Sequence, residues 1–153
     1  MNQQDPKLPG SEQPGQAIRS ILEAVSPTVR VPLAISLGAI AGALSRYYLS
    51  LGFNQWLGTA FPFGTFCINL SGAFIMGFFA TLAIEGRIRS PELRLAIAVG
   101  FLGSYTTFSS YQLEAEKLLT IGQRGLTCLY WIGSAILGVA CLELGAYLAR
   151  RLR

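Results

Sequence analysis

Neutral polar side chains gather in three otherwise apolar stretches of the sequence. The stretch 62–84 carries Thr65 and Asn69, and the stretch 126–149 carries Tyr130 and Ser134. Each pair is four residues apart, which places its members on one face of a helix. The remaining polar residues lie within GFLGSYTTFSSY, residues 100–111. A polar group inside lipid is unfavourable unless it is paired or lines a water-filled path, so this pattern indicates a functional site.

Uncharged hydrogen-bond donors of this kind could bind an anion. Hydroxyl and amide groups can replace its water shell, and the edge of an aromatic ring carries partial positive charge. Phe108 and Tyr111 are three residues apart and become neighbours on a helix, although packing aromatics have the same spacing. The acidic and basic residues within the apolar stretches lie near their ends, which favours a passive pathway over a proton-coupled carrier.

The run 100–111 also predicts a break in a helix. Two glycines and consecutive threonines are poor helix formers. Unwound backbone within a bilayer must face protein or a cavity, and its carbonyl groups could then bind a small cation. An intact helix, with the hydroxyls bonded to the preceding turn, is an equally good interpretation of the same residues.

The elements that must position these residues are membrane helices. Only 13% of the 153 residues are charged and 52% are hydrophobic, too little charge for a soluble domain. Four apolar stretches are long enough to span a bilayer, at about 31–51, 62–84, 95–119 and 126–149. Short connections make neighbouring helices antiparallel. The sequence therefore predicts an all-α membrane protein with four transmembrane helices, and Pro32 suits the first turn of the first.

Small residues recur four apart at Gly38/Gly42, Ala73/Gly77 and Ser134/Gly138, a spacing that would let helices approach closely. A general abundance of glycine in membrane helices explains each single pair equally well. Residues 1–28 are polar and proline-rich, and we expect a disordered tail in which 17–25 could form a short surface helix. The channel domain would then comprise residues 29–153.

The distribution of charge predicts the orientation. Nine lysines and arginines lie on the side of the termini and the middle connection, against three on the other side. Both termini are therefore expected in the cytoplasm. The basic residues are not interleaved with aromatics, which argues against nucleic acid. The chain has no histidine and three scattered cysteines, so we expect neither a zinc site nor an enzyme.

Three segments resemble, in the same order, characteristic segments of the CrcB/Fluc family of fluoride channels: GALSRY at 42–47, GTFCINLSG at 64–72 and GFLGSYTTFSSY at 100–111. The resemblance covers about residues 31–150. It implies a fluoride-selective passive channel in the plasma (cell inner) membrane that exports cytoplasmic fluoride. It also implies a dual-topology antiparallel dimer whose two pores are each formed by both subunits.

The resemblance assigns roles to individual residues. Asn69 corresponds to the pore asparagine, and Phe108 and Tyr111 correspond to the two pore phenylalanines. The polar residues of the same pore would be Thr107, Ser109, Ser110, Tyr130 and Ser134. A structural Na⁺ at the dimer centre would be held by the backbone carbonyls of Gly103 and Thr106, and Glu114 falls at a vestibule glutamate.

The chain departs from the family pattern at Tyr111, where phenylalanine is usual, and at Ser104, which replaces a common glycine. The unequal charge distribution leaves two partners open, an antiparallel homodimer or a heterodimer with an oppositely oriented chain. Two other functions are considered. A small multidrug-type exporter would need a carboxylate in the first span, which has none, and a non-transport assembly subunit would use the Ser/Thr run only to join helices.

Overall fold

The computed structural model describes residues 27–152, so the predicted tail and its short helix lie outside the described residues. Three helices are long and apolar enough to cross a membrane: α2 (Pro27–Leu57), α3 (Phe63–Ile84) and α7 (Arg124–Arg151). They coincide with the first, second and fourth predicted spans. Because α2 begins at Pro27, Pro32 lies inside the helix, and its predicted place in the first turn is wrong.

The third predicted span is a bent, segmented helix. It consists of α4 (Pro91–Leu95), the π-helical η1 (Ala96–Leu102), α5 (Gly103–Tyr105) and α6 (Phe108–Thr120). Thr106 and Thr107, between α5 and α6, are extended, with φ/ψ of −79°/157° and −150°/120°. The predicted break is thus confirmed, and the alternative of an intact helix is wrong. The π-helical turn that precedes the break has no counterpart in the sequence prediction.

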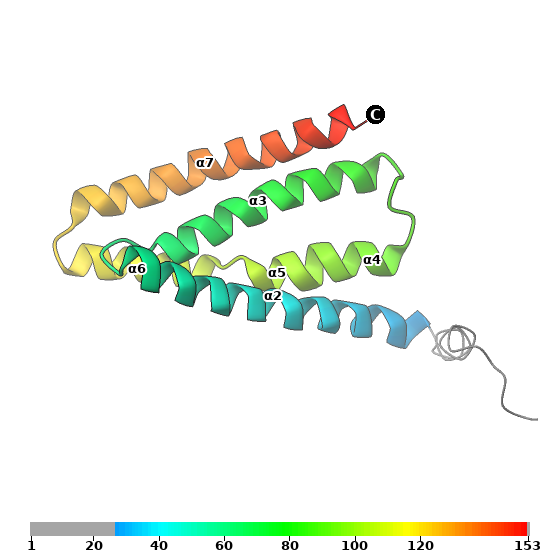
Figure 1. Ribbon diagram of the computed structural model, residues 1–153, viewed down its shortest axis with the longest axis horizontal. Coiled ribbons are helices and arrows are strands. Elements are labelled where there is room, and N and C mark those ends of the chain that lie inside the picture. The colour runs from blue at the N-terminus through cyan, green and yellow to red at the C-terminus, as the bar shows by residue number, and fades with distance from the viewer. Residues whose placement is uncertain (1–26, 153) are drawn as a thin grey trace, which may run out of the picture.

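The long helices run antiparallel, as the short connections predicted. Figure 1 shows the start of α2, the α3–α4 connection and the C-terminus at one end of the molecule, and the α2–α3 and α6–α7 connections at the other. Each of these three connections contains a glycine with positive φ: Gly58 (76°), Gly86 (75°) and Gly122 (81°). Glycine adopts this left-handed conformation without strain and commonly ends a helix in this way.

Glycines bring two pairs of segments into backbone contact. α2 packs along η1, and α3 packs along α7. A Cβ on Gly100 would collide with the carbonyl oxygen of Ile35, and one on Gly145 would collide with that of Phe74. The predicted close approach at Gly38/Gly42 is confirmed, since both abut the backbone of η1. The prediction for Ser134/Gly138 is wrong within this chain, because a Cβ on Gly138 would meet no atom.

Candidate functional site

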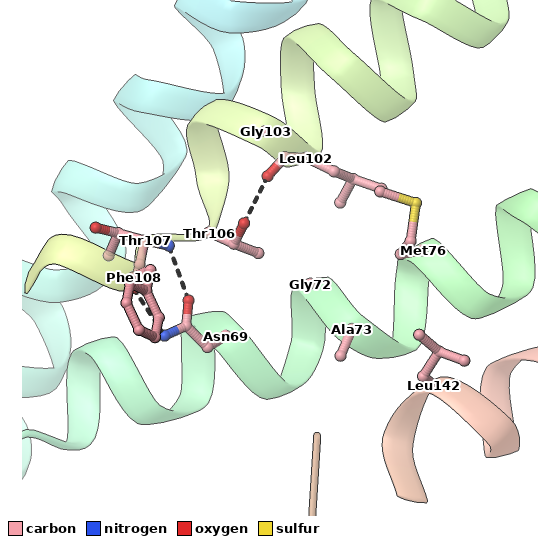
Figure 2. A pocket seen from close by; sticks show the side chains of 10 residues that line it. All are labelled: Asn69, Gly72, Ala73, Met76, Leu102, Gly103, Thr106, Thr107, Phe108 and Leu142. Atoms are coloured by element: carbon pink, nitrogen blue, oxygen red, sulfur yellow. Dashed lines mark hydrogen bonds between the residues drawn. The ribbon is translucent and has the colours of Figure 1, made fainter. Parts of the chain in front are cut away.

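The break in the third segment is held by the side chain of Asn69, which projects from α3. Its Nδ2 donates to the carbonyl oxygen of Thr107 at 3.1 Å, and its Oδ1 accepts from the Thr107 amide at 2.9 Å (Figure 2). Asn69 therefore replaces the backbone acceptor that the Thr107 amide would have in a continuous helix, and it gives the Thr107 carbonyl a donor in addition to the first intrahelical bond of α6. Such replacement is needed where no water can pair the backbone.

Thr107 in turn begins the next helix. Its Oγ1 accepts from the Ser110 amide at 3.2 Å and lies 3.1 Å from Ser110 Oγ and 3.4 Å from Ser109 Oγ. Threonine with extended backbone is a favourable N-cap because its hydroxyl pairs an amide that has no intrahelical partner. Thr107, Ser109 and Ser110 thus form one hydroxyl cluster at the start of α6.

These contacts leave two carbonyl groups without their usual helical donors. In a continuous helix the Thr107 amide would bond to the carbonyl of Gly103, and the Ser110 amide would bond to that of Thr106. Here the first donates to Asn69 and the second to the Thr107 hydroxyl. Thr106 itself still bonds back, through its amide and its Oγ1, to the Leu102 carbonyl at 3.0 and 2.9 Å. The freed carbonyls of Gly103 and Thr106 are oxygen ligands of the kind that hard cations prefer.

Two pockets adjoin the break. The first, the break pocket, has a volume of about 360 Å³, and Figure 2 labels its lining, which includes Gly72, Gly103, Thr106 and Leu142. The second, the aromatic pocket, has a volume of about 260 Å³ and is lined by Asn69, Phe108, Tyr111, Ser134 and Ala135. Asn69 and Phe108 border both pockets.

The aromatic pocket contains ring edges and one unpaired hydroxyl. The Phe108 and Tyr111 rings have centroids 5.8 Å apart, so the predicted neighbour relation is confirmed. Phe108 is 72% exposed and is free to contact a ligand or a second subunit. The buried Oγ of Ser134 lies beside the Tyr111 hydroxyl but forms no hydrogen bond of good geometry among residues 27–152. A buried hydroxyl without a partner is unfavourable, which makes it a candidate donor to a bound ion.

A carboxylate lies beyond the aromatic pocket along α6. Glu114 accepts from Thr65 Oγ1 at 2.8 Å through one oxygen and from the Tyr130 hydroxyl at 3.0 Å through the other. The ring of Tyr130, which is fully buried, lies 4.8 Å from that of Tyr111. Residues from α3, α6 and α7 thus join in one cluster that continues the polar face from Asn69 towards the α6–α7 connection.

The residues predicted from sequence meet at this one place in the fold. Asn69 and Thr65 both face α6, Tyr130 and Ser134 both face Tyr111, and Gly103 and Thr106 lie at the break. Gly103, Phe108 and Ser109 are exposed at the surface of the single chain. Thr65 was placed on the helix face of Asn69 from the sequence, but it was assigned no role in the pore. Its spacing from Asn69 was the available signal, but its partner, Glu114, is distant in sequence.

Comparison with known proteins identifies the family. The model of the family described as "CrcB-like protein, Camphor Resistance (CrcB)" matches residues 33–146. A protein of Trichormus variabilis named "Fluoride-specific ion channel FluC" is 58% identical over 127 residues, which cover 81% of this chain and 91% of the relative.

Two further relatives bear the same name. The one from Synechococcus sp. strain JA-2-3B'a(2-13) is 53% identical, over 82% of this chain and 97% of its own length. The one from Synechocystis sp. is 50% identical, over 82% of this chain and 96% of its own length. The resemblance inferred from the three segments is thereby confirmed. This multi-pass membrane protein belongs to the CrcB/FluC family.

Proposed function

We propose that this protein is a fluoride-specific ion channel through which cytoplasmic fluoride leaves the cell passively. The observation that carries the proposal is the identity of half or more to three proteins named as such channels, over about four fifths of the chain. It is a channel and not an enzyme, as the family relation indicates.

The geometry of the site is compatible with an anion. The donors of the aromatic pocket are uncharged, and they comprise the Asn69 amide, the Ser134 hydroxyl and the edges of the Phe108 and Tyr111 rings. Neutral donors can replace water around a fluoride ion without holding it so tightly that it cannot leave. We assign the pore to Asn69, Phe108 and Tyr111, with the hydroxyl groups of Thr107, Ser109, Ser110, Tyr130 and Ser134 beside them.

Asn69 has two tasks in this assignment. One of its two Nδ2 hydrogens and its Oδ1 are bound to Thr107, which fixes the orientation of the amide. The second Nδ2 hydrogen remains available, and Asn69 borders the aromatic pocket. The residue that holds the break can therefore present one fixed donor to the ion.

The residues at the break fit a structural Na⁺. The carbonyls of Gly103 and Thr106 have lost their helical donors to Asn69 and Thr107, and Gly103 carries no side chain that could cover them. Each chain offers two carbonyl oxygens, so two chains meeting here would offer four. The cation would stabilise the break by replacing the missing donors.

A second subunit completes the proposed channel. Phe108 is largely exposed in the single chain, as are apolar side chains along α2 and α7. We propose an antiparallel dimer in which two copies, or this chain and an oppositely oriented partner, meet at the break. The excess of basic residues beside the termini favours the orientation with both termini in the cytoplasm.

Liposomes that contain the purified protein and are loaded with fluoride test the function directly. Dilution into fluoride-free medium, with valinomycin to carry the balancing potassium, should release fluoride to an electrode, while chloride-loaded liposomes should stay tight. Phe108→Ala should abolish the release and leave the oligomer unchanged on gel filtration, because it removes a ring edge from the pocket. Wild-type liposomes as tight as empty ones would refute the proposal.

A further inference from the structure

A third pocket lies at the end of α6, beside the α2–α3 connection. This outer pocket has a volume of about 400 Å³, and its polar lining consists of Asn54, Thr59, Glu114 and Lys117. Glu114 is also the carboxylate bound by Thr65 and Tyr130, whose ring contacts Tyr111. The outer pocket therefore adjoins the same polar face as the aromatic pocket and lies closer to the helix connections at this end of the molecule.

The lining of the outer pocket contains two charged side chains of opposite sign, Glu114 and Lys117. Both Glu114 oxygens accept hydrogen bonds from neutral hydroxyls, which stabilise the carboxylate but do not cancel its charge. Lys117 follows one helical turn later, is exposed and forms no ion pair among the described residues. Its ammonium group is the positive charge in the lining, and it offsets the negative charge of Glu114.

The other charges nearby point elsewhere. The Glu116 carboxylate lies 3.4 Å from the Thr120 hydroxyl, on another face of α6. Arg124 begins α7 and is exposed, but it does not line the outer pocket. Removal of Lys117 would therefore leave the pocket with a net negative charge that repels anions.

We propose that Lys117 is a positioning residue for anion entry, which neutralises the field of Glu114 so that fluoride can accumulate in the outer pocket. The inference rests on the function proposed above. It concerns the rate at which the ion arrives, because a charge at the mouth of a cleft changes the local ion concentration and not the chemistry further inside. Such an effect must weaken as salt screens the charge.

The test uses full-length protein in liposomes of zwitterionic lipid, which carry no surface charge of their own. Initial fluoride efflux is measured at ionic strengths of about 0.01 M and about 1 M, where the Debye length is about 30 Å and about 3 Å. At low ionic strength Lys117→Gln should slow efflux by about two- to fivefold, and Lys117→Glu should slow it further. At high ionic strength the differences should vanish.

Arg124→Gln is the matched control, since it removes an equal charge at the same end of the molecule but outside the pocket. At low ionic strength it should slow efflux less than Lys117→Gln does, because its charge lies farther from the pocket, and at high ionic strength it should leave efflux unchanged; Lys117→Arg should keep the salt dependence of the wild type. The proposal is overturned if Lys117→Gln matches the wild type at low ionic strength, if its deficit persists at high ionic strength, or if Arg124→Gln has the same deficit. A wild-type protein that releases no fluoride would instead refute the channel function itself.

Discussion

The two halves of the bent third segment are held in the fold by different forces. The first half, from Pro91 to Tyr105, packs along α2 with glycine backbones in contact, as at Gly100 against Ile35. The second half, α6, is attached to α3 and α7 through a cluster of buried side chains, which includes Ala115, Leu118 and Tyr130, and through polar contacts such as Asn69–Thr107 and Glu114–Tyr130.

This difference indicates that the first half serves as the structural support and that the second half borders the site. Close backbone contact between helices gains dispersion energy and tolerates little change of shape, which suits the rigid half. Side-chain hydrogen bonds fix direction at isolated points and leave pockets between them, which suits the half that borders the break, aromatic and outer pockets. Mutations in the two halves should therefore affect stability and fluoride efflux to different extents.

The largest effect is expected in the first half. Gly100→Ala places a Cβ on the Ile35 carbonyl, so α2 and η1 must separate. Overpacking destabilises by about 1–3 kcal/mol and occasionally more, and the upper end is expected here because the obstructing atoms belong to the backbone. The folded fraction in an SDS titration should fall markedly, and efflux should fall with it.

Gly125→Ala is the control, because it adds the same methyl group to α7 where nothing lies nearby. It should be neutral or stabilising by up to about 1 kcal/mol. Equal stability of the two variants would contradict the role given to glycine packing.

An intermediate effect is expected at the boundary between the halves. Asn69→Leu removes both bonds to Thr107 and leaves the Thr107 amide unpaired, at about 1–3 kcal/mol, while the Thr107 carbonyl keeps the first intrahelical bond of α6. Fluoride efflux should be lost. Part of the stability should be kept, since the glycine contacts remain and α6 can shift.

Asn69→Asp provides a comparison, since it keeps the acceptor for the Thr107 amide but loses the donor. It should fall between the wild type and Asn69→Leu in SDS resistance. Retention of wild-type efflux by Asn69→Leu would contradict the assignment of Asn69 to both the break and the pore.

The smallest effects are expected in the second half, where two tyrosines form a matched pair. Tyr130→Phe removes a 3.0 Å hydrogen bond to a carboxylate and should lower stability by about 1–3 kcal/mol. Tyr111→Phe removes only a 3.4 Å contact with the Trp131 carbonyl. It should change stability by less than about 0.5 kcal/mol.

Efflux should be slowed by Tyr130→Phe and retained by Tyr111→Phe, which creates the phenylalanine usual in the family. Stability is measured by SDS titration and efflux in liposomes. A larger loss in Tyr111→Phe than in Tyr130→Phe would show that the Tyr111 hydroxyl, and not that of Tyr130, supports this half.

The sequence was sufficient for the features that depend on local composition. Apolar length gave three spans, and the Gly/Thr content of residues 100–111 gave the break. It was insufficient for contacts between distant segments. The hydrogen bond of Thr65 to Glu114 joins residues 49 positions apart. The two hydrogen bonds between the Asn69 side chain and the Thr107 backbone depend on how α3 crosses the break. The π-helical turn lies where η1 packs along α2, and the spacing of residues in the sequence did not predict it.

The extended pair Thr106–Thr107 has an electrostatic consequence. The helical run that ends at Tyr105 presents the negative end of its peptide dipoles to the break, and α6 presents a positive end two residues later. Opposite partial charges, each supplied by main chain alone, thus lie side by side at the interruption. In the channel proposed above, one short interruption would stabilise a cation on one side and an anion on the other without an ionised side chain.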